Sequence, residues 1–351
     1  MTSIPTTMKA LVIEEQGKAV IKDHPVPTIA EDEVLIKTAA VALNPTDWKH
    51  IYGAHVVVGS VVGCDASGVV VQVGKNVTTL KAGDKVTHMT HGSAFTELGA
   101  FAEYVKAPAD LTWVIPENTL SFEEAASFGV AFLTAVQVFY NPKFLDIVEP
   151  PAKVSGEEWL LIYGGSSSVG QYAIQLAHLA GYKVVSTASP RNHALVKDFG
   201  ADVVFDYRDP DVVAKIKAAT GDSITRVLDT ISEEDTQRIC AAAIAPAGGK
   251  LNLILPPKPS SIARSDIKVT SSLLYSSTGR PLNFGPVHIP AAPEDRVQIA
   301  AFLKKVPQLV TERSVKPITI KRWEGGLPMI VDALQYLREG KASAEKIVLR
   351  L

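Results

Sequence analysis

Cysteine is nearly absent from this chain of 351 residues, which contains only Cys64 and Cys240. Two cysteines are too few for a disulfide framework and too few for a four-cysteine structural zinc site. We therefore expect both thiols to be reduced, and the fold to be held by a hydrophobic core rather than by crosslinks.

The chain also lacks a surplus of charge and any long apolar run. Lys and Arg total 35 against 37 Asp and Glu, so no positive excess is available to bind a phosphate backbone or an anionic membrane. No run approaches the roughly 18 apolar residues of a membrane span. Glu14 and Glu15 interrupt the N-terminal region before an apolar signal core forms. We expect a cytoplasmic protein with no nucleic-acid and no membrane partner.

Hydrophobic residues make up 46% of the chain, which at 351 residues is enough to bury a large core and is typical of about two domains. Residues 8 to 110 are rich in Val and Thr, and their short apolar runs are separated by turn residues, which predicts a β-rich module. From Trp159 onward, apolar strands alternate with turns and helical periodicity, which is typical of βαβ units in a parallel sheet.

The second region predicts the six strands of a doubly wound sheet, at 159–163, 183–187, 203–205, 226–229, 250–254 and 269–275. Helices are expected between them, near 169–180, 190–199, 210–219 and 234–244. After Pro290 the pattern predicts helices at 295–310 and 327–339 and a terminal strand at 346–351. These tail elements are expected to return to the first domain.

The most specific motif is a glycine- and serine-rich loop between an expected strand and an expected helix. It consists of Gly164, Gly165, Ser166, Ser167, Ser168, Val169 and Gly170. Free backbone N–H groups and the positive end of the helix dipole bind a pyrophosphate at such a place. The spacing of Gly165 and Gly170 differs from the G-x-G-x-x-G of NAD enzymes, so a structural turn of another α/β protein is the alternative. The flanking strand and helix favour a dinucleotide site.

The end of the next strand favours NADPH over NADH. NAD enzymes place an Asp or Glu there, about 20 residues past the loop, to bind the ribose hydroxyls. This chain has no acid in that region, which contains Ser186, Ser189, Pro190, Arg191 and Asn192. Ser186 and Ser189 can donate hydrogen bonds to a 2′-phosphate, and Arg191 can add a charge-assisted contact. The alternative for Arg191 is an exposed residue at the start of a helix.

Several motifs resemble the quinone oxidoreductase branch of the medium-chain dehydrogenase/reductase superfamily. They are Gly156 to Gly170, Asp32 to Ile36, Asn44-Pro45-Thr46-Asp47-Trp48-Lys49, Gly63 to Gly68 and Ala82 to Val86. Within that branch, Gly164 to Val169, Ala188 to Asn192 and Phe205 to Arg208 most resemble fungal trans-acting enoyl reductases, which partner polyketide synthases. The resemblance spans nearly the whole chain. It implies an α/β fold with a GroES-like catalytic domain, residues 1–127 and 291–351, and a Rossmann NADPH-binding domain, residues 128–290.

The resemblance also implies which further positions contact NADPH and substrate. The NADPH positions are Asn44, Pro45, Thr46, Trp48, Tyr207, Ile254, Leu255, Ala344 and Glu345. Tyr207 is similar to a family tyrosine that stacks near the adenine. The substrate positions are Ala131, Phe132, Leu133, Thr134, Tyr275 and Ser276. For Phe132 and Leu133 the alternative is plain hydrophobic core.

The positions of a catalytic zinc site are altered in this chain. The metal ligands of related zinc-dependent alcohol dehydrogenases correspond to Asn44 and Cys64 here, and a catalytic zinc needs three protein ligands. The region of their structural zinc contains His88 and His91 without any cysteine. We expect no metal, and therefore reduction of a conjugated double bond rather than alcohol oxidation.

Such a reduction needs hydride at the β-carbon, a partner for the enolate oxygen and a proton for the α-carbon. The resemblance places the segment with Lys49 beside the nicotinamide, so Lys49 is the first candidate for the proton donor or oxyanion partner. A surface lysine with solvent as the proton source is the alternative. We expect Asp47 to orient other groups, because a carboxylate would oppose the enolate, and Thr134 to bind the carboxamide. Residues 256 to 263 lack periodicity and are either a lid or a surface loop.

Four functions remain open at this point. The first is an enoyl reductase, either stand-alone or acting on a carrier-bound substrate with a polyketide synthase partner. The others are an NADPH:quinone oxidoreductase, a non-catalytic NADPH-binding protein and a zinc alcohol dehydrogenase. The expected edge strand at Val269 to Tyr275 carries Ser271 and Ser272, so a monomer is favoured slightly over a homodimer.

Overall fold

The computed structural model describes residues 4–258, 262 and 264–351. Residues 259–261 and 263 of the expected lid or surface loop lie outside the described residues. The chain forms two compact units. The first unit contains Met1–Val130 and Tyr275–Leu351, and the second contains Ala131–Leu274.

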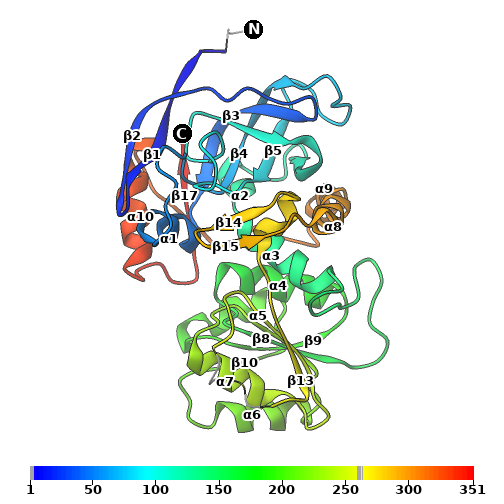
Figure 1. Cartoon of the computed structure of the whole chain (residues 1–351). Helices are drawn as coiled ribbons and strands as arrows, with labels where there is room; N and C mark the ends of the chain where they lie inside the picture. Colours follow the sequence, from blue (N-terminus) through cyan, green and yellow to red (C-terminus); the bar gives the residue numbers. More distant parts are fainter. Residues whose placement is uncertain (1–3, 259–261, 263) are drawn as a thin grey trace. The chain divides into compact units, whose positions relative to one another are not determined.

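The second unit is built on a six-stranded parallel sheet, drawn in green to yellow in Figure 1. Its strands are β8 (Trp159–Tyr163), β9 (Lys183–Thr187), β10 (Val203–Phe205), β11 (Arg226–Asp229), β12 (Gly249–Leu253) and β13 (Ile267–Ser271). Their order across the sheet is β10-β9-β8-β11-β12-β13. The chain reverses direction across the sheet beside β8, which is the order of the doubly wound Rossmann fold. The expected fold class is confirmed.

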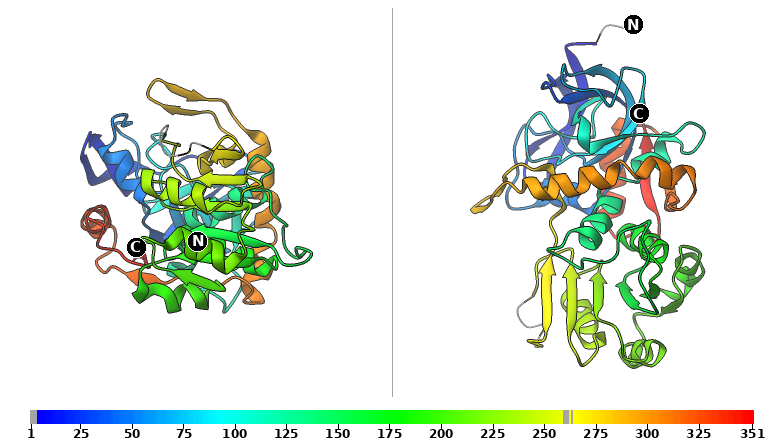
Figure 2. Two further views of the ribbon diagram at one scale, coloured as in Figure 1. Left: turned by 90° about the horizontal axis from the view of Figure 1, so that it is seen from below. Right: turned by 90° about the vertical axis from the view of Figure 1, so that its right-hand side faces the viewer.

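Helices α4 (Ser168–Leu179), α5 (His193–Asp198), α6 (Val212–Thr220) and α7 (Glu234–Ala243) connect these strands. Figure 2 shows the strands side by side, with helices packed against the sheet. The core of this unit is aliphatic, because strands covered on both faces need apolar side chains throughout. Leu161, Val185, Val227 and Leu251 are fully buried in it.

The first unit is β-rich and contains a seven-stranded sheet. Its strands are β3 (Glu33–Ala42), β4 (Asp65–Val73), β5 (Lys85–Met89), β6 (Tyr104–Pro108), β7 (Thr112–Val114), β16 (Ile320–Arg322) and β17 (Lys346–Arg350). Strands β1 (Thr7–Glu15) and β2 (Lys18–Pro25) form a separate antiparallel pair. The C-terminal β17 pairs with β3, as Figure 1 shows in red beside blue. The tail therefore returns to the first unit.

Four helices of the first unit bear on the site. They are α1 (Pro45–Tyr52), α2 (Phe122–Ala126), α8 (Pro293–Leu303) and α10 (Ile330–Arg338). Helix α8 is followed by α9 (Val306–Thr311), whereas the sequence pattern predicts one helix over 295–310. The break has a physical cause, because Pro307 has no N–H to donate to the carbonyl of Leu303 and its ring crowds that turn.

Residues 275 to 290 belong to the first unit in the structure, whereas the sequence assigns them to the second domain. The strand expected to reach Tyr275 ends at Ser271, and the 3-10 helix η3 (Leu274–Thr278) follows. Strands β14 (Leu282–Phe284) and β15 (Val287–Ile289) then form a hairpin. The segment is fixed to the first unit by a hydrogen bond between the Tyr275 and Thr46 hydroxyls and by one that Arg280 donates to Glu33.

Across the described residues, every helix is too short or too polar to span a lipid bilayer.

Candidate functional site

The loop after β8 has the geometry of a dinucleotide site. Gly164 adopts φ +80°, a conformation that favours glycine, and lets the chain turn sharply away from the strand. Ser167 caps α4 by accepting a hydrogen bond from the Gly170 amide at 2.9 Å, and its hydroxyl donates to Thr230 at 2.8 Å. The first N–H groups of this 12-residue helix have no intrahelical acceptor, as at every helix start, which makes the place suited to an anion.

Gly165 lies directly on strand β9. A Cβ atom at this position would be 2.1 Å from the Ser186 hydroxyl oxygen, so only glycine allows the loop to come this close. The same hydroxyl donates to the Ile162 carbonyl at 2.6 Å, and Ser186 is fully buried. The structure therefore corrects the expectation that Ser186 faces a 2′-phosphate, because its side chain points under the loop instead.

The other residues after β9 lie at the surface of the second unit. Ser189 is half-buried, whereas Pro190 and Arg191 are exposed and form, with Asn192, the 3-10 helix η2 (Pro190–Asn192). The neighbouring Tyr207 is 42% exposed. Arg208 lies over the Tyr207 ring at 5.4 Å and forms a bidentate pair with Asp206. The structure thus offers an exposed aromatic face where the resemblance implies the adenine.

After β12, Ile254 and Leu255 make their hydrogen bonds through backbone groups. The Ile254 amide donates to the Ser232 hydroxyl at 2.9 Å, and the Leu255 carbonyl accepts from Ser271 at 3.1 Å. Both residues are half-buried. Helix α3 (Val130–Tyr140) contains Ala131, Phe132, Leu133 and Thr134, which are all buried in the structure.

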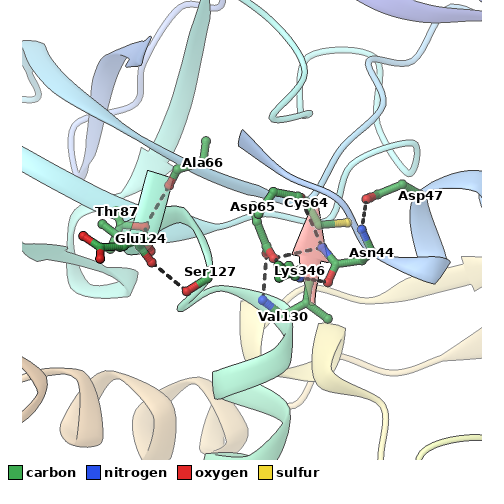
Figure 3. A network of polar contacts seen from close by, with 12 residues as sticks. Asn44, Asp47, Cys64, Asp65, Ala66, Thr87, Glu124, Ser127, Val130 and Lys346 are labelled. Carbon is green, nitrogen blue, oxygen red and sulfur yellow. Dashed lines mark hydrogen bonds and ion pairs between the residues drawn. The ribbon is translucent and has the colours of Figure 1, made fainter. Parts of the chain in front are cut away.

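A buried polar network in the first unit joins Asn44, Asp65 and Lys346 (Figure 3). The side-chain amide of Asn44 donates a hydrogen bond to Asp65 at 2.9 Å. The Lys346 ammonium donates to the Asn44 oxygen and, at 3.1 Å, to Asp65. All three side chains are at most 3% exposed. The other Asp65 oxygen accepts from the Val130 amide at 2.7 Å and so fixes the start of α3.

Asp47 is a second buried carboxyl group beside this network. It accepts a hydrogen bond from the backbone N–H of Asn44 at 2.6 Å, as part of a capping box at the start of α1. Burial raises the pKa of Asp47 to about 7, and the nearby Asp65 adds to the rise. The hydrogen bond from the Asn44 backbone N–H and the positive charge of Lys346 lower the pKa of Asp47 and partly offset the rise. The geometry is compatible with the orienting role expected for Asp47, because the carboxyl group fixes the turn that carries Asn44.

A third group of polar side chains surrounds Tyr275. The Tyr275 hydroxyl is 2.8 Å from the Thr46 hydroxyl and 3.3 Å from the Cys64 sulfur. The Thr46 hydroxyl is in turn 3.3 Å from Nδ1 of His50. His91 stacks on the Tyr275 ring, with 3.7 Å between the centroids and 10° between the planes. Burial lowers the pKa of His91 to about 3, so this stacked imidazole is neutral.

The remaining predicted residues lie apart from these contacts. Lys49 is exposed, and its amine is 5.7 Å from the centroid of the Trp48 ring. Pro45 is exposed at the start of α1. Ser276 donates to Asp295. Ala344 has φ +58°, and Glu345 pairs with Lys321 at 3.5 Å, just before the buried Lys346.

The residues around Asn44 do not fit a zinc ion. Asp65, the nearest ionised ligand type, is neutralised by the Lys346 ammonium instead of a metal. No group of three or more metal-ligating side chains occurs within residues 4–258, 262 and 264–351. Burial lowers the pKa of His88 to about 4, and neither of its ring nitrogens has a hydrogen-bond partner among the described residues.

Sequence reasoning missed three residues of the site, namely His50, Asp65 and Lys346. His50 shares a helix face with Thr46 at i and i+4, which is a signal that the sequence contains. Asp65 appeared only as part of a glycine-flanked motif. Lys346 begins an apolar strand, and nothing in the sequence pattern indicates that its ammonium group turns inward.

Comparison with known protein families gives two matches. Residues 30–117 match the alcohol dehydrogenase GroES-like domain. Residues 168–280 match the zinc-binding dehydrogenase domain. The second model takes its name from zinc, but the Asn44–Asp65–Lys346 network lies outside the residues that it matches.

Similar proteins cover nearly the entire chain. A trans-enoyl reductase of Alternaria alternata is 39% identical over 98% of this chain and 99% of its own length. A quinone oxidoreductase of Coxiella burnetii has a solved structure that is 26% identical, with a TM-score of 0.72, over 98% of this chain and 99% of its own. A mycobacterial protein solved in complex with NADPH is 25% identical, with a TM-score of 0.75, over 98% of this chain and 100% of its own.

Proposed function

Because the chain belongs to the medium-chain dehydrogenase/reductase superfamily, in the branch that contains the trans-enoyl reductases, we propose that it reduces an activated carbon–carbon double bond with NADPH. The observation that carries this proposal is the combination of a nucleotide loop with a buried polar network whose cation is the Lys346 ammonium group. The loop after β8 suits a pyrophosphate, and Lys346 supplies a fixed positive charge beside Asn44. The protein is a nicotinamide-dependent oxidoreductase of the enoyl reductase type.

Several features of the second unit support NADPH as the cofactor. No carboxylate follows β9, where an NAD enzyme binds its ribose hydroxyls. Ser189, Arg191 and Asn192 remain as the polar residues for a 2′-phosphate, since Ser186 is committed to the sheet. Tyr207 offers its exposed ring to the adenine, and Arg208 is held over that ring by Asp206. When bound, NADPH supplies the hydride.

The protein's own residues then bind and orient the reactants. The start of α4 binds the pyrophosphate through its free N–H groups. Asp47 holds the turn of the first unit that carries Asn44, Pro45, Thr46 and Trp48, the residues that we propose for cofactor contact in this unit. In the second unit, Thr134 binds the carboxamide and Ala131 to Leu133 contact the substrate. In the first unit, the substrate residues are Tyr275 and Ser276. Lys49 stays a candidate for the enolate oxygen, because its exposed amine can reach a bound ligand.

The substrate class that we propose is an α,β-unsaturated thioester, and the partner is a polyketide synthase that presents it on a carrier. The trans-enoyl reductase of Alternaria alternata supports this substrate class, since it matches along its full length. Other relatives with the same description match at 35 to 40% identity. The quinone oxidoreductase structure supports the second candidate, an NADPH:quinone oxidoreductase.

We propose that the protein is a monomer in the cytoplasm. The edge strand β13 has the exposed Lys268 and Ser271, and a charged edge disfavours pairing with a second chain. Light scattering that gives the mass of one chain, 37.5 kDa, supports this, and twice that mass contradicts it.

The experiment that tests the function follows NADPH oxidation at 340 nm with four substrates: an enoyl thioester, a simple enone, a quinone and an aldehyde. Each is measured with and without a chelator, and with NADH in place of NADPH. We expect the thioester to have the highest kcat/KM with NADPH, with no change on adding the chelator. Preference for the quinone selects the second candidate. Chelator-sensitive turnover of the aldehyde overturns the proposal.

A further inference from the structure

We propose that Tyr275 is the proton donor of the reaction, and that His50 restores its proton through the Thr46 hydroxyl. This inference rests on the proposed function and names the source of the proton that an enoyl reductase must deliver. The geometry carries it, because three titratable or hydroxyl groups of the first unit form one continuous hydrogen-bonded chain.

Each link of this chain is within hydrogen-bonding distance. The Tyr275 hydroxyl lies 2.8 Å from the Thr46 hydroxyl, which lies 3.3 Å from Nδ1 of His50. Thr46 and His50 are one turn apart on α1, so the helix itself sets their spacing. Tyr275 comes from η3, some 229 residues later in the sequence. The chain therefore joins a residue of the expected substrate set to one of the expected cofactor set.

The surroundings of Tyr275 keep it in its acid form. Burial raises the pKa of Tyr275 well above its ordinary value of 10, and Cys64 and Asp47 add to the rise. His91 stacks on its ring and is neutral, so it offers the phenolate no charge. Tyr275 therefore holds its proton until an enolate forms as a stronger base.

His50 is suited to connect this chain to water. It is half-buried, whereas Tyr275 is only 7% exposed, so water reaches His50 more readily. Burial lowers its pKa, and the imidazole is neutral at physiological pH with one proton to pass on. The groups facing it are Thr46, His91 at 5.5 Å and Tyr275 at 6.0 Å between ring centroids.

One proton leaves Tyr275, and one proton from water replaces it along the hydrogen-bonded chain. Hydride transfer to the β-carbon leaves an enolate, and its α-carbon takes the proton from the Tyr275 hydroxyl as the O–H bond breaks. The phenolate takes the Thr46 hydroxyl proton, and Thr46 takes the Nδ1 proton of His50. His50 accepts a proton at Nε2 from water in the same relay and ends as the other neutral tautomer. The net consumption is one hydride and one water-derived proton.

The test uses a 2-methyl-2-enoyl thioester, whose α-carbon becomes a stereocentre when it is protonated. Wild-type protein, Tyr275→Phe, Thr46→Val and Thr46→Ser are compared for kcat, for the ratio of product enantiomers, and for NADPH affinity by fluorescence. Tyr104→Phe, on strand β6 of the same unit, is the matched control and is expected to behave as wild type.

We expect Tyr275→Phe to lower kcat by about 100-fold or more, the usual size of a general acid's contribution, and to give both enantiomers. NADPH affinity stays unchanged. Thr46→Val also lowers kcat, and Thr46→Ser restores it because its hydroxyl rebuilds the chain.

A single enantiomer from Tyr275→Phe overturns the proposal, whatever its rate, since Tyr275 then shapes the site without donating the proton. Equal activity of Thr46→Val and Thr46→Ser overturns the relay through Thr46. If the proposed function itself is wrong, the wild-type protein reduces no enoyl thioester, which distinguishes that outcome from failure of the Tyr275 role alone.

Discussion

The Lys346 ammonium group compensates the buried charge of Asp65 in the first unit. Asp65 is fully buried, and both of its oxygens accept hydrogen bonds. One oxygen accepts from the backbone N–H of Val130, and the other accepts from Lys346 and from the side-chain amide of Asn44. A buried carboxylate without a cation is costly, because the protein interior solvates charge poorly. Lys346 therefore compensates the charge of the carboxylate whose other oxygen holds the start of α3.

Lys346→Met is expected to lower the free energy of unfolding by about 3 to 5 kcal/mol, because it leaves Asp65 buried without its cation. Urea unfolding at neutral pH measures this loss. Adding Asp65→Asn to the variant removes the stranded charge, and we expect it to recover part of the stability. Lys341→Met, which breaks an exposed pair with Glu339, is the control and costs less than about 1 kcal/mol. An equal loss for both lysines contradicts this account.

Asp47 makes stability depend on pH with an unusual sign. Its pKa rises from the ordinary 3.8 to about 7 in the folded protein, so the folded state holds a proton that the unfolded state releases. Its contribution to stability therefore falls as the pH rises from about 4 to 7 and is constant above that. His88 and His91, with pKa values lowered to about 4 and about 3, act oppositely, because their contribution is lost as the pH falls below 6.5.

Comparing wild-type protein with Asp47→Asn isolates this effect, because both proteins contain the same histidines. The shift of roughly 3 pKa units corresponds to about 4 kcal/mol at 1.36 kcal/mol per unit. We expect the stability of wild type relative to the variant to decline by that order between pH 4 and pH 7. Unfolding curves at several pH values test it, and a constant difference would show that Asp47 titrates normally.

Among the elements, the parallel strands were the most predictable. Strands β8 to β11 occupy the ranges expected from the sequence, since each is a short apolar run between turn residues. The break between α8 and α9 was not predicted, because Pro307 stands within a pattern that is otherwise helical. The hairpin β14–β15 was missed because each strand has only three residues, which is too short for apolar alternation to indicate a strand.

The candidate site was less predictable than the strands that surround it. The glycine-rich loop follows from local sequence, because its glycines and serines are adjacent in the chain. The Asn44–Asp65–Lys346 contacts join segments up to 302 residues apart, and no local pattern encodes them. Ser186 shows the same limit, because alternation along β9 decides which way its hydroxyl points, and the covering loop decides what it contacts.

The close contact between Gly165 and Ser186 of β9 makes cofactor binding sensitive to the size of residue 165. Gly165→Ala places a methyl group against the Ser186 hydroxyl and displaces the loop, so we expect NADPH affinity to fall by at least about tenfold. Ser186→Ala alone removes one hydrogen bond and costs about 1 kcal/mol of stability. The double variant is expected to bind NADPH better than Gly165→Ala. Isothermal titration measures all three, and unchanged affinity in Gly165→Ala refutes the close approach.

For the whole molecule, cofactor binding is expected to raise stability through mass action. At 100 times its Kd, a ligand that binds only the folded protein adds about 2.7 kcal/mol to the free energy of unfolding. We expect NADPH to produce this increase at a lower concentration than NADH, because no acid after β9 repels a 2′-phosphate. Thermal unfolding across a concentration series of each nucleotide measures it, and an equal response to both removes the basis for the cofactor choice.

The buried ammonium of Lys346 also constrains how this protein can diverge. Acquiring a zinc site requires new ligands at Asn44 and elsewhere, and a metal there would be repelled by the ammonium group already in place. Replacing Lys346 first strands the charge of Asp65, whereas adding ligands first brings two cations together. Each single substitution is therefore harmful before the full set is complete. Mutation one residue at a time would therefore meet a fitness valley between this polar network and a metal site.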